Sequence, residues 1–284
     1  MNLYHDYQNR LAVRVINLDK RPDRFLKFKQ IPLGFTNFSR FSAVDGSLES
    51  SFADVTQATK LRILTRKRHL HEELDSPGAW GASQSHFILW KQLINSPSDY
   101  MLVLEDDIDL TLFQAPGSLS AFIFNQLIHV PPDWDLFLLS GSIFHCSNWS
   151  LPLPRPLHSS YLSTDNCLSS ESFIDVISFM GAQSYIITKQ GAQLLLSRAR
   201  PIEYHIDAYI SLQSQLGHIR IIASNNPNDR LSVTDSSTDI DHTPLLTNST
   251  STTQCECNNN YLWIFLFFLL LLLVLILFIV KIDQ

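Results

Sequence analysis

Short runs of apolar residues alternate along the chain with segments that have a helical period. Residues 11–18, LAVRVINL, predict a buried strand, because branched apolar residues dominate and the polar turn DKRPDR follows. Residues 24–30 then favour a helix. The segment FTNFSRFSAVDG, residues 35–46, predicts a second strand that ends at an Asp-Gly turn.

The alternation continues through the middle of the chain. Residues 83–94, SQSHFILWKQLI, have an amphipathic helical period, and Ser83 or Ser85 is a suitable N-cap. Two further strands are predicted, at 100–107 (YMLVLEDD) and 134–141 (WDLFLLSG), and the start of 184–199 (SYIITKQGAQLLLSRA) predicts a strand or a turn that leads into a helix. Strands that alternate with helices favour an α/β fold with a mostly parallel sheet.

Two C-terminal segments depart from this pattern. Residues 229–260 are dense in Ser, Thr, Asn and Asp and poor in aromatic residues, which predicts a flexible polar linker. Residues 261–280, YLWIFLFFLLLLLVLILFIV, carry no charge and span about 30 Å as a helix, the thickness of a bilayer core. They predict one transmembrane helix, so that residues 1–228 form the globular domain and 281–284 a short tail.

Composition bears on location and partners. The N-terminus lacks a charged segment followed by a long apolar stretch, so we expect no signal peptide and a cytosolic globular domain anchored by its C-terminal segment. Cys146 and Cys167 are either thiols or a disulfide pair, and Cys255 and Cys257 are either palmitoylated or unmodified. The net charge of −6 does not indicate a nucleic-acid partner; the basic run at 60–69, KLRILTRKRH, is either a solvated loop or a phosphate-facing patch.

Candidate chemistry gathers at the end of the strand predicted at 100–107. Four apolar residues there run into Glu105, Asp106 and Asp107. Carboxylates this close repel and raise one another's pKa unless a positive charge lies among them. A divalent cation removes the repulsion, prefers oxygen ligands and often bridges to phosphate. Since ligands of α/β sheets bind at the carboxyl ends of strands, the cluster indicates a metal site, with a plain acidic turn as the alternative.

Several segments, taken in order, resemble glycosyltransferase family 25: VINLDKRPDRF, SAVDG, GAWGASQSHFILW, LVLEDD, GAQSYIITKQGAQLLL and PIEYHIDAYI. The resemblance covers residues 12 to about 225. It implies a nucleotide-sugar-binding domain of the GT-A type that moves a hexose, galactose or glucose, from a UDP-sugar with inversion. The acceptor would be a glycan, a lipid-linked group or a protein side chain. The acidic motif would hold a divalent ion, usually Mn²⁺, on the donor diphosphate.

The resemblance also implies roles for individual residues. Asp107 and Glu105 would contact the metal, and Asp207 would be the general base, with Asp106 as its rival. Six further residues would bind the donor: Asn17, Arg21, Arg24, Asp45, Ser85 and His86.

Other positions match or depart from the family pattern without pointing to chemistry. Gly181, Tyr185 and Gly191 match and are interpreted as architectural. Ala79 and Ala82 stand where the family has Glu and Cys, which affects only the expected acceptor binding. The alternative function is a catalytically silent, membrane-tethered binding protein with the same fold, which the intact acidic motif disfavours. A phosphoesterase would need more His and Asp ligands around two metals.

Overall fold

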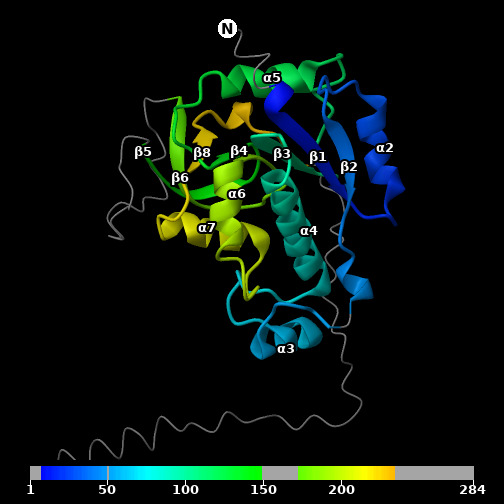
Figure 1. Ribbon diagram of the computed structural model, residues 1–284, viewed down its shortest axis with the longest axis vertical. Helices are drawn as coiled ribbons and strands as arrows, with labels where there is room; N and C mark the ends of the chain where they lie inside the picture. The colour runs from blue at the N-terminus through cyan, green and yellow to red at the C-terminus, as the bar shows by residue number, and fades with distance from the viewer. Residues whose placement is uncertain (1–7, 50, 149–171, 234–284) are drawn as a thin grey trace, which may run out of the picture. The chain divides into compact units, whose positions relative to one another are not determined.

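The computed structural model describes residues 8–49, 51–148 and 172–233. Within this part of the chain eight strands form one sheet in the order β2-β1-β3-β7-β4-β8-β6-β5 (Figure 1). The strands are β1 (Leu11–Asn17), β2 (Phe38–Ser42), β3 (Tyr100–Glu105), β4 (Leu136–Leu138), β5 (Ser142–Asn148), β6 (Phe173–Met180), β7 (Ser184–Thr188) and β8 (Ile221–Ser224). The helices are α2 (Pro22–Gln30), α3 (Gln57–Thr65), α4 (Pro77–Ile94), α5 (Ser118–Leu127), α6 (Lys189–Leu196) and α7 (Ile206–Gln215), with short 3-10 turns η1 (Gly46–Leu48) and η3 (Pro227–Asp229).

The sheet is mixed, so the prediction of a mostly parallel sheet is wrong. Parallel pairing joins β1 to β2, β1 to β3, and β4 to β8. The pairs β3–β7, β4–β7, β6–β8 and β5–β6 are antiparallel. The prediction assumed a crossover helix between successive strands, whereas β7 follows β6 after residues 181–183 and then runs antiparallel to both of its neighbours.

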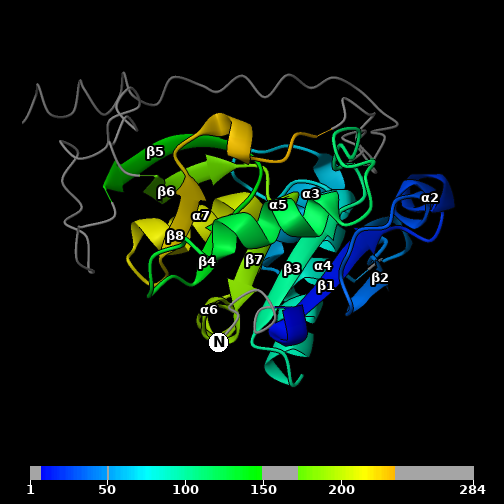
Figure 2. The same cartoon turned by 90° about the horizontal axis from the view of Figure 1, so that it is seen from above.

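Helices cover both faces of the sheet, which gives three layers (Figures 1 and 2). Alternate residues of a strand point to opposite faces. On β3, Leu102 and Leu104 pack with residues of α2 and α5, whereas Met101 and Val103 pack with residues of α4, α6 and α7. Because the central strands are buried on both faces, they read as continuous apolar runs in the sequence.

The helix α4 begins earlier than the sequence pattern predicts. Its N-cap is Ser76, whose Oγ accepts a hydrogen bond of 3.1 Å from the backbone N–H of Ala79. The expected caps, Ser83 and Ser85, lie inside the helix and are fully buried. The strands predicted from residues 11–18, 35–46, 100–107, 134–141 and 184–188 correspond to β1, β2, β3, β4 and β7, and are confirmed.

The C-terminal predictions fall mostly on residues that the structure does not describe. Residues 234–260 of the linker, the segment 261–280 and the tail 281–284 lie outside the described residues. Among the described residues, no helix has both the length and the apolar character needed to cross a membrane. The folded part continues past residue 228, because Leu231 is buried and Val233 forms a β-bridge with Ile108.

Candidate functional site

A cavity of about 560 Å³ opens where β1 and β3 end and α4 begins. All of the expected site residues except Arg21 and Asp207 line this cavity: Asn17, Arg24, Asp45, Ser85, His86, Glu105, Asp106 and Asp107. We call it the strand-end cavity. Its position agrees with the general rule that ligands of open α/β sheets bind at the carboxyl ends of strands.

The pairing of β1 with β3 explains why residues far apart in sequence meet here. The two strands are parallel neighbours, and Ile16 lies opposite Glu105. The next residue of each strand, Asn17 and Asp106, therefore leaves the sheet at the same edge. The Nδ2 of Asn17 donates a 2.6 Å hydrogen bond to Oδ2 of Asp106.

Asp106 is the carboxylate that the protein neutralises with its own groups. Its side chain is buried, and its Oδ1 accepts a hydrogen bond of 3.2 Å from Arg24 in addition to the one that Oδ2 accepts from Asn17. Asn17 is itself fixed, because its Oδ1 accepts a 2.7 Å hydrogen bond from Nε of Arg40. Both oxygens of Asp106 are thus engaged, which suits a residue that holds the site together.

The surroundings of Asp107 disfavour its negative charge. Burial of its carboxyl, followed by the negative charges of Glu105 and Asp106, raises its pKa to about 7. Arg24 opposes this effect but does not outweigh it. The cations of the protein therefore do not fully offset the repulsion among the three carboxylates.

Glu105, the last residue of β3, lines the cavity, and its carboxylate is contacted by a buried histidine. His86 on α4 lies with Nε2 at 3.2 Å from Oε1 of Glu105. The other ring nitrogen of His86, Nδ1, is 2.7 Å from the hydroxyl of Tyr185 on β7.

The loop after β2 forms another wall. Nζ of Lys20 lies 2.8 Å from Oδ2 of Asp45, and the backbone N–H of Ser47 donates a 3.0 Å hydrogen bond to Oδ1. Burial opposes ionisation of Asp45, but the hydrogen bonds from Lys20 and Ser47 prevail and lower its pKa. Asp45 is thus charged, and its carboxylate is engaged by Lys20 and by the backbone N–H of Ser47.

Close contact with α4 holds this loop in place. Ser85, which was expected to bind the donor, accepts a 2.9 Å hydrogen bond from the backbone N–H of Val44 and donates one of 2.8 Å to the carbonyl of Gly81. A Cβ on Gly46 would lie 1.8 Å from the carbonyl oxygen of Pro77, so only glycine fits at this contact. The hydroxyl of Ser85 is therefore engaged in holding the loop after β2 against α4.

The cavity residues that were missed from the sequence include Lys20, Arg66 and Gln183. Lys20 precedes the expected Arg21 in the turn DKRPDR, and it lines the cavity whereas Arg21 does not. Arg66 lies in the basic run 60–69, and its position favours the phosphate-facing interpretation of that residue. Gln183 carries no signal in the sequence; its carbonyl accepts a 2.7 Å hydrogen bond from the backbone N–H of Glu105.

Arg21 and Asp207 lie elsewhere. The guanidinium of Arg21 donates to the carboxylate of Asp23 at 3.1 and 3.2 Å. Asp207 lines a different cavity, of about 650 Å³, beside α7. Its Oδ2 accepts from the backbone N–H of Gly181 and its Oδ1 from that of Ala208, each at 2.8 Å. Sequence order alone could not show that Asp207 and the acidic motif line different cavities.

The residues present can be tested against the expected metal. Among the described residues, no three His, Cys, Asp or Glu side chains are grouped closely enough to hold a metal ion by themselves. Asp107 and Glu105 nevertheless supply hard oxygen ligands in a region of excess negative charge. Ions of this class are often held by one or two carboxylates together with the phosphates of the substrate. The donor set therefore fits an ion that binds with a diphosphate.

Comparison with known proteins bears on the family. Residues 11–120 match the family model described as glycosyltransferase family 25 (LPS biosynthesis protein). The resemblance to glycosyltransferase family 25 is confirmed over this segment. The family 25 segment contains all of the expected residues that line the strand-end cavity, whereas Asp207 lies outside it. The match implies glycosyltransferase activity, with a sugar donor and an acceptor.

Other comparisons add little to the family match. No curated protein matches the chain. A solved structure titled "Crystal Structure of A197 from STIV" is similar with a TM-score of 0.31 and 10% sequence identity, covering 82% of this chain and 99% of that one. A likeness at this level carries no argument about fold or function.

Proposed function

We propose that the chain is a metal-dependent, inverting glycosyltransferase that moves a hexose, galactose or glucose, from a UDP-sugar to a glycan, lipid-linked or protein acceptor. The family match supports glycosyl transfer. The observation that carries the finer proposal is the convergence of three consecutive carboxylates with Lys20, Arg24 and Arg66 in one cavity.

The cavity suits a nucleoside diphosphate in size and charge. Its volume of about 560 Å³ falls within the roughly 300–1,000 Å³ of small-molecule sites. Lysine and arginine side chains form charge-assisted hydrogen bonds with phosphate oxygens. Pro77 and Gly78, in the first turn of α4, also line the cavity, and a helix N-terminus favours negative charge.

Asp107 and Glu105 are the residues that would hold the metal. When bound, a divalent ion would offset the charge that develops on the leaving diphosphate. Asp106 is a poorer ligand, because Arg24 and Asn17 already engage both of its oxygens. In this proposal Asp106 aligns the motif, and its two neighbours face the ligand.

The reaction itself needs a base near the acceptor. The acceptor hydroxyl oxygen bonds to the anomeric carbon of the donor, the bond from that carbon to the diphosphate oxygen breaks, and UDP leaves with the electron pair. The hydroxyl proton passes to the base. Asp207 stays the prediction for this role, and its two carboxylate oxygens accept hydrogen bonds from backbone N–H groups. Its rival Asp106 has both oxygens engaged as well, by Arg24 and Asn17.

Attachment to a bilayer through residues 261–280 is also part of the proposal, since this segment is uncharged and long enough to span. The cytosolic placement stays a prediction. Cys146 is disulfide-bonded. Disulfides persist in oxidising compartments, so this bond weighs against the cytosol. Protease treatment of intact vesicles, followed by a gel with and without reductant, decides between the two sides.

The test of activity uses the full-length protein and a panel of UDP-sugars. We expect UDP release from UDP-galactose or UDP-glucose that requires Mn²⁺, and Asp107→Ala should reduce it to a few per cent or less. The matched control is Asp99→Ala, which removes a carboxylate just before the opposite end of β3, where it pairs with Arg10. This control should retain activity. Substantial activity in Asp107→Ala would contradict the metal assignment, and binding of UDP-sugars without turnover would favour the silent binding protein.

A further inference from the structure

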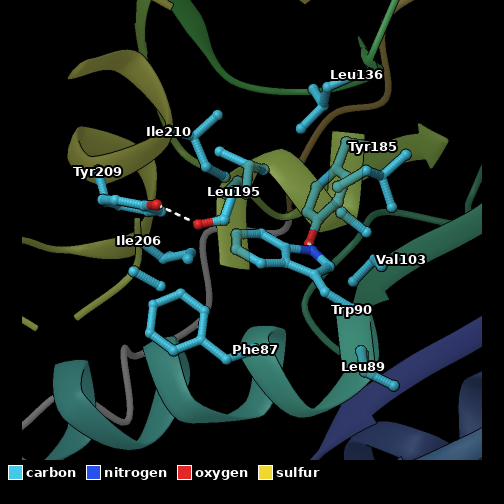
Figure 3. Packing of buried hydrophobic residues seen from close by; sticks show 14 of the residues in the cluster. Phe87, Leu89, Trp90, Val103, Leu136, Tyr185, Leu195, Ile206, Tyr209 and Ile210 are labelled. Carbon is cyan, nitrogen blue, oxygen red and sulfur yellow. Dashed lines mark hydrogen bonds between the residues drawn. The ribbon is translucent and has the colours of Figure 1, made fainter. Parts of the chain in front are cut away.

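A chain of hydrogen bonds runs from the core to the strand-end cavity. Nε1 of Trp90 donates to the hydroxyl of Tyr185 at 2.9 Å, the hydroxyl is 2.7 Å from Nδ1 of His86, and Nε2 of His86 is 3.2 Å from Oε1 of Glu105. Trp90, Tyr185 and His86 are essentially fully buried, whereas Glu105 lines the cavity. Figure 3 shows the first link, where the indole nitrogen of Trp90 meets the phenol oxygen of Tyr185.

The donors and acceptors of this chain can be ordered from its inner end. An indole N–H can only donate, so the oxygen of Tyr185 accepts from Trp90. The phenol proton then has Nδ1 of His86 as its acceptor among the described residues, which requires Nδ1 to carry no proton. The ring proton of His86 is therefore on Nε2, and it is donated to Glu105.

We propose that Trp90 and Tyr185 are positioning residues that hold His86 in its Nε2–H tautomer, so that His86 fixes the carboxylate of Glu105 for the nucleotide-sugar. Trp90 and Tyr185 have no hydrogen bond to Glu105 and affect its orientation through His86. This inference rests on the proposed function in so far as Glu105 contacts the metal–diphosphate group.

The orientation of Glu105 depends on His86 to an unusual degree. Among the described residues, the only hydrogen bond to the carboxylate of Glu105 comes from His86. One oxygen is thereby held from the core side, and the other is left for a ligand in the cavity. Partners of this kind, which orient the groups that bind a ligand, commonly change affinity or activity by about 10–100-fold when they are removed.

Packing alone does not require the polar atoms of this chain. Tyr185 and His86 stack with ring centroids 5.7 Å apart, and His86 also lies against Trp90. Phenylalanine at positions 90 and 185 would preserve aromatic packing and leave no buried donor to satisfy. A buried polar network is costly when any member is unsatisfied, so a role limited to packing gives no reason for it.

The first test is Tyr185→Phe in the full-length protein, with UDP binding measured by calorimetry in the presence of Mn²⁺. We expect affinity to fall by about 10–100-fold. The matched control is Tyr209→Phe, because Tyr209 is also buried in this core and its hydroxyl donates a single 2.5 Å hydrogen bond to the carbonyl of Leu195 (Figure 3). Tyr209→Phe should lower the melting temperature and leave UDP affinity unchanged. Equal UDP affinity in Tyr185→Phe and wild type would overturn the proposal.

A double variant separates positioning from stability. Trp90→Phe combined with Tyr185→Phe removes both the indole donor and its acceptor, so no indole N–H is left unsatisfied. Because the smaller ring also leaves a cavity in the core, we expect the melting temperature to fall below that of Tyr185→Phe alone, while UDP affinity stays at the level of Tyr185→Phe. If affinity falls further together with stability, the chain acts only through the fold and the proposal is refuted.

The tautomer itself is measured by ¹⁵N NMR, with the His86 signals assigned by comparison with His86→Gln. The expected spectrum shows an unprotonated Nδ1 and a protonated Nε2 in wild type, and a loss of this preference in Tyr185→Phe. A protonated Nδ1 in wild type would overturn the inference. This measurement needs no nucleotide, so it decides the inference even if wild type fails to bind UDP and the proposed function falls.

Discussion

Replacing Asp107 by asparagine should make the protein more stable at neutral and alkaline pH while it destroys the proposed metal site. The substitution keeps the shape of the side chain and removes its charge. In the folded protein that charge is disfavoured by burial and by the neighbouring Glu105 and Asp106, which raise the pKa of Asp107 to about 7. A group with a raised acidic pKa opposes folding once the pH exceeds its value in the unfolded chain.

The size of the effect follows from the two pKa values of Asp107. Between an unfolded value of 3.8 and a folded value of about 7, the ionised carboxylate costs up to about 4 kcal/mol at pH 8. Below pH 3.8 both states are protonated and the cost vanishes; at pH 5 only about 1.5 kcal/mol of it is present. Wild type therefore loses stability as the pH rises through this window, and Asp107→Asn should lose less. For a domain of this size the difference at pH 8 corresponds to a melting temperature higher by on the order of 8–16 °C.

The assay is thermal unfolding of the full-length protein, followed by tryptophan fluorescence at pH 5 and pH 8. The gap between Asp107→Asn and wild type should widen from pH 5 to pH 8. Added Mn²⁺ with UDP should raise the melting temperature of wild type and leave the variant unchanged, because ligands stabilise only the state that binds them. Asp99→Asn, which replaces a partly exposed carboxylate paired with Arg10, is the matched control for the loss of one negative charge. A variant that is less stable than wild type at pH 8, or an equal gap at both pH values, would refute the reasoning.

Two further predictions concern the general base and the loop that bears Asp45. Asp207→Asn should lower kcat by about 10²-fold or more without changing UDP affinity; an unchanged kcat would leave Asp207 with only its structural bonds to two backbone N–H groups. Gly46→Ala should weaken UDP binding in calorimetry, because its Cβ would lie 1.8 Å from a backbone oxygen of Pro77 and the loop bearing Asp45 must shift; unchanged UDP affinity and stability would show that the loop and α4 separate easily.

The carboxyl ends of β1 and β3 could be located from the sequence because their signals are strong and local. Each strand is a run of apolar residues buried on both faces, followed at once by polar residues. Once two such strands are assigned to one α/β sheet, their polar ends are expected to lie along the same edge. This reasoning located Glu105, whereas Asn17 came from the resemblance to the family; the two residues line one cavity.

Other elements gave no comparable signal. The N-cap residue of α5 is Gly117, with a φ of 73° and no capping side chain, so the usual marker of a helix start is missing. β8 has only four residues, and a run that short is ambiguous without its neighbours. The direction of β7 depends on which strands it lies between, and this is decided by packing across the sheet rather than by residues near it.

The different environments of Asp106 and Asp107 could not be predicted from the local sequence. The two residues are adjacent and chemically identical, yet Asp106 receives the cation and the amide that are available, from residues 82 and 89 positions away.

The unfavourable charge that remains at Asp107 is the reason for a functional interpretation. Arg24 and Asn17 stabilise Asp106, and a hydrogen bond from His86 orients Glu105. Burial of Asp107, and then repulsion from both neighbours, raises its pKa to about 7. Natural proteins retain such destabilising groups where function needs them, and replacing them often increases stability. A cation that arrives with a diphosphate would relieve the same repulsion, so the strain at Asp107 and the proposed binding of a metal-bound nucleotide-sugar have one electrostatic cause.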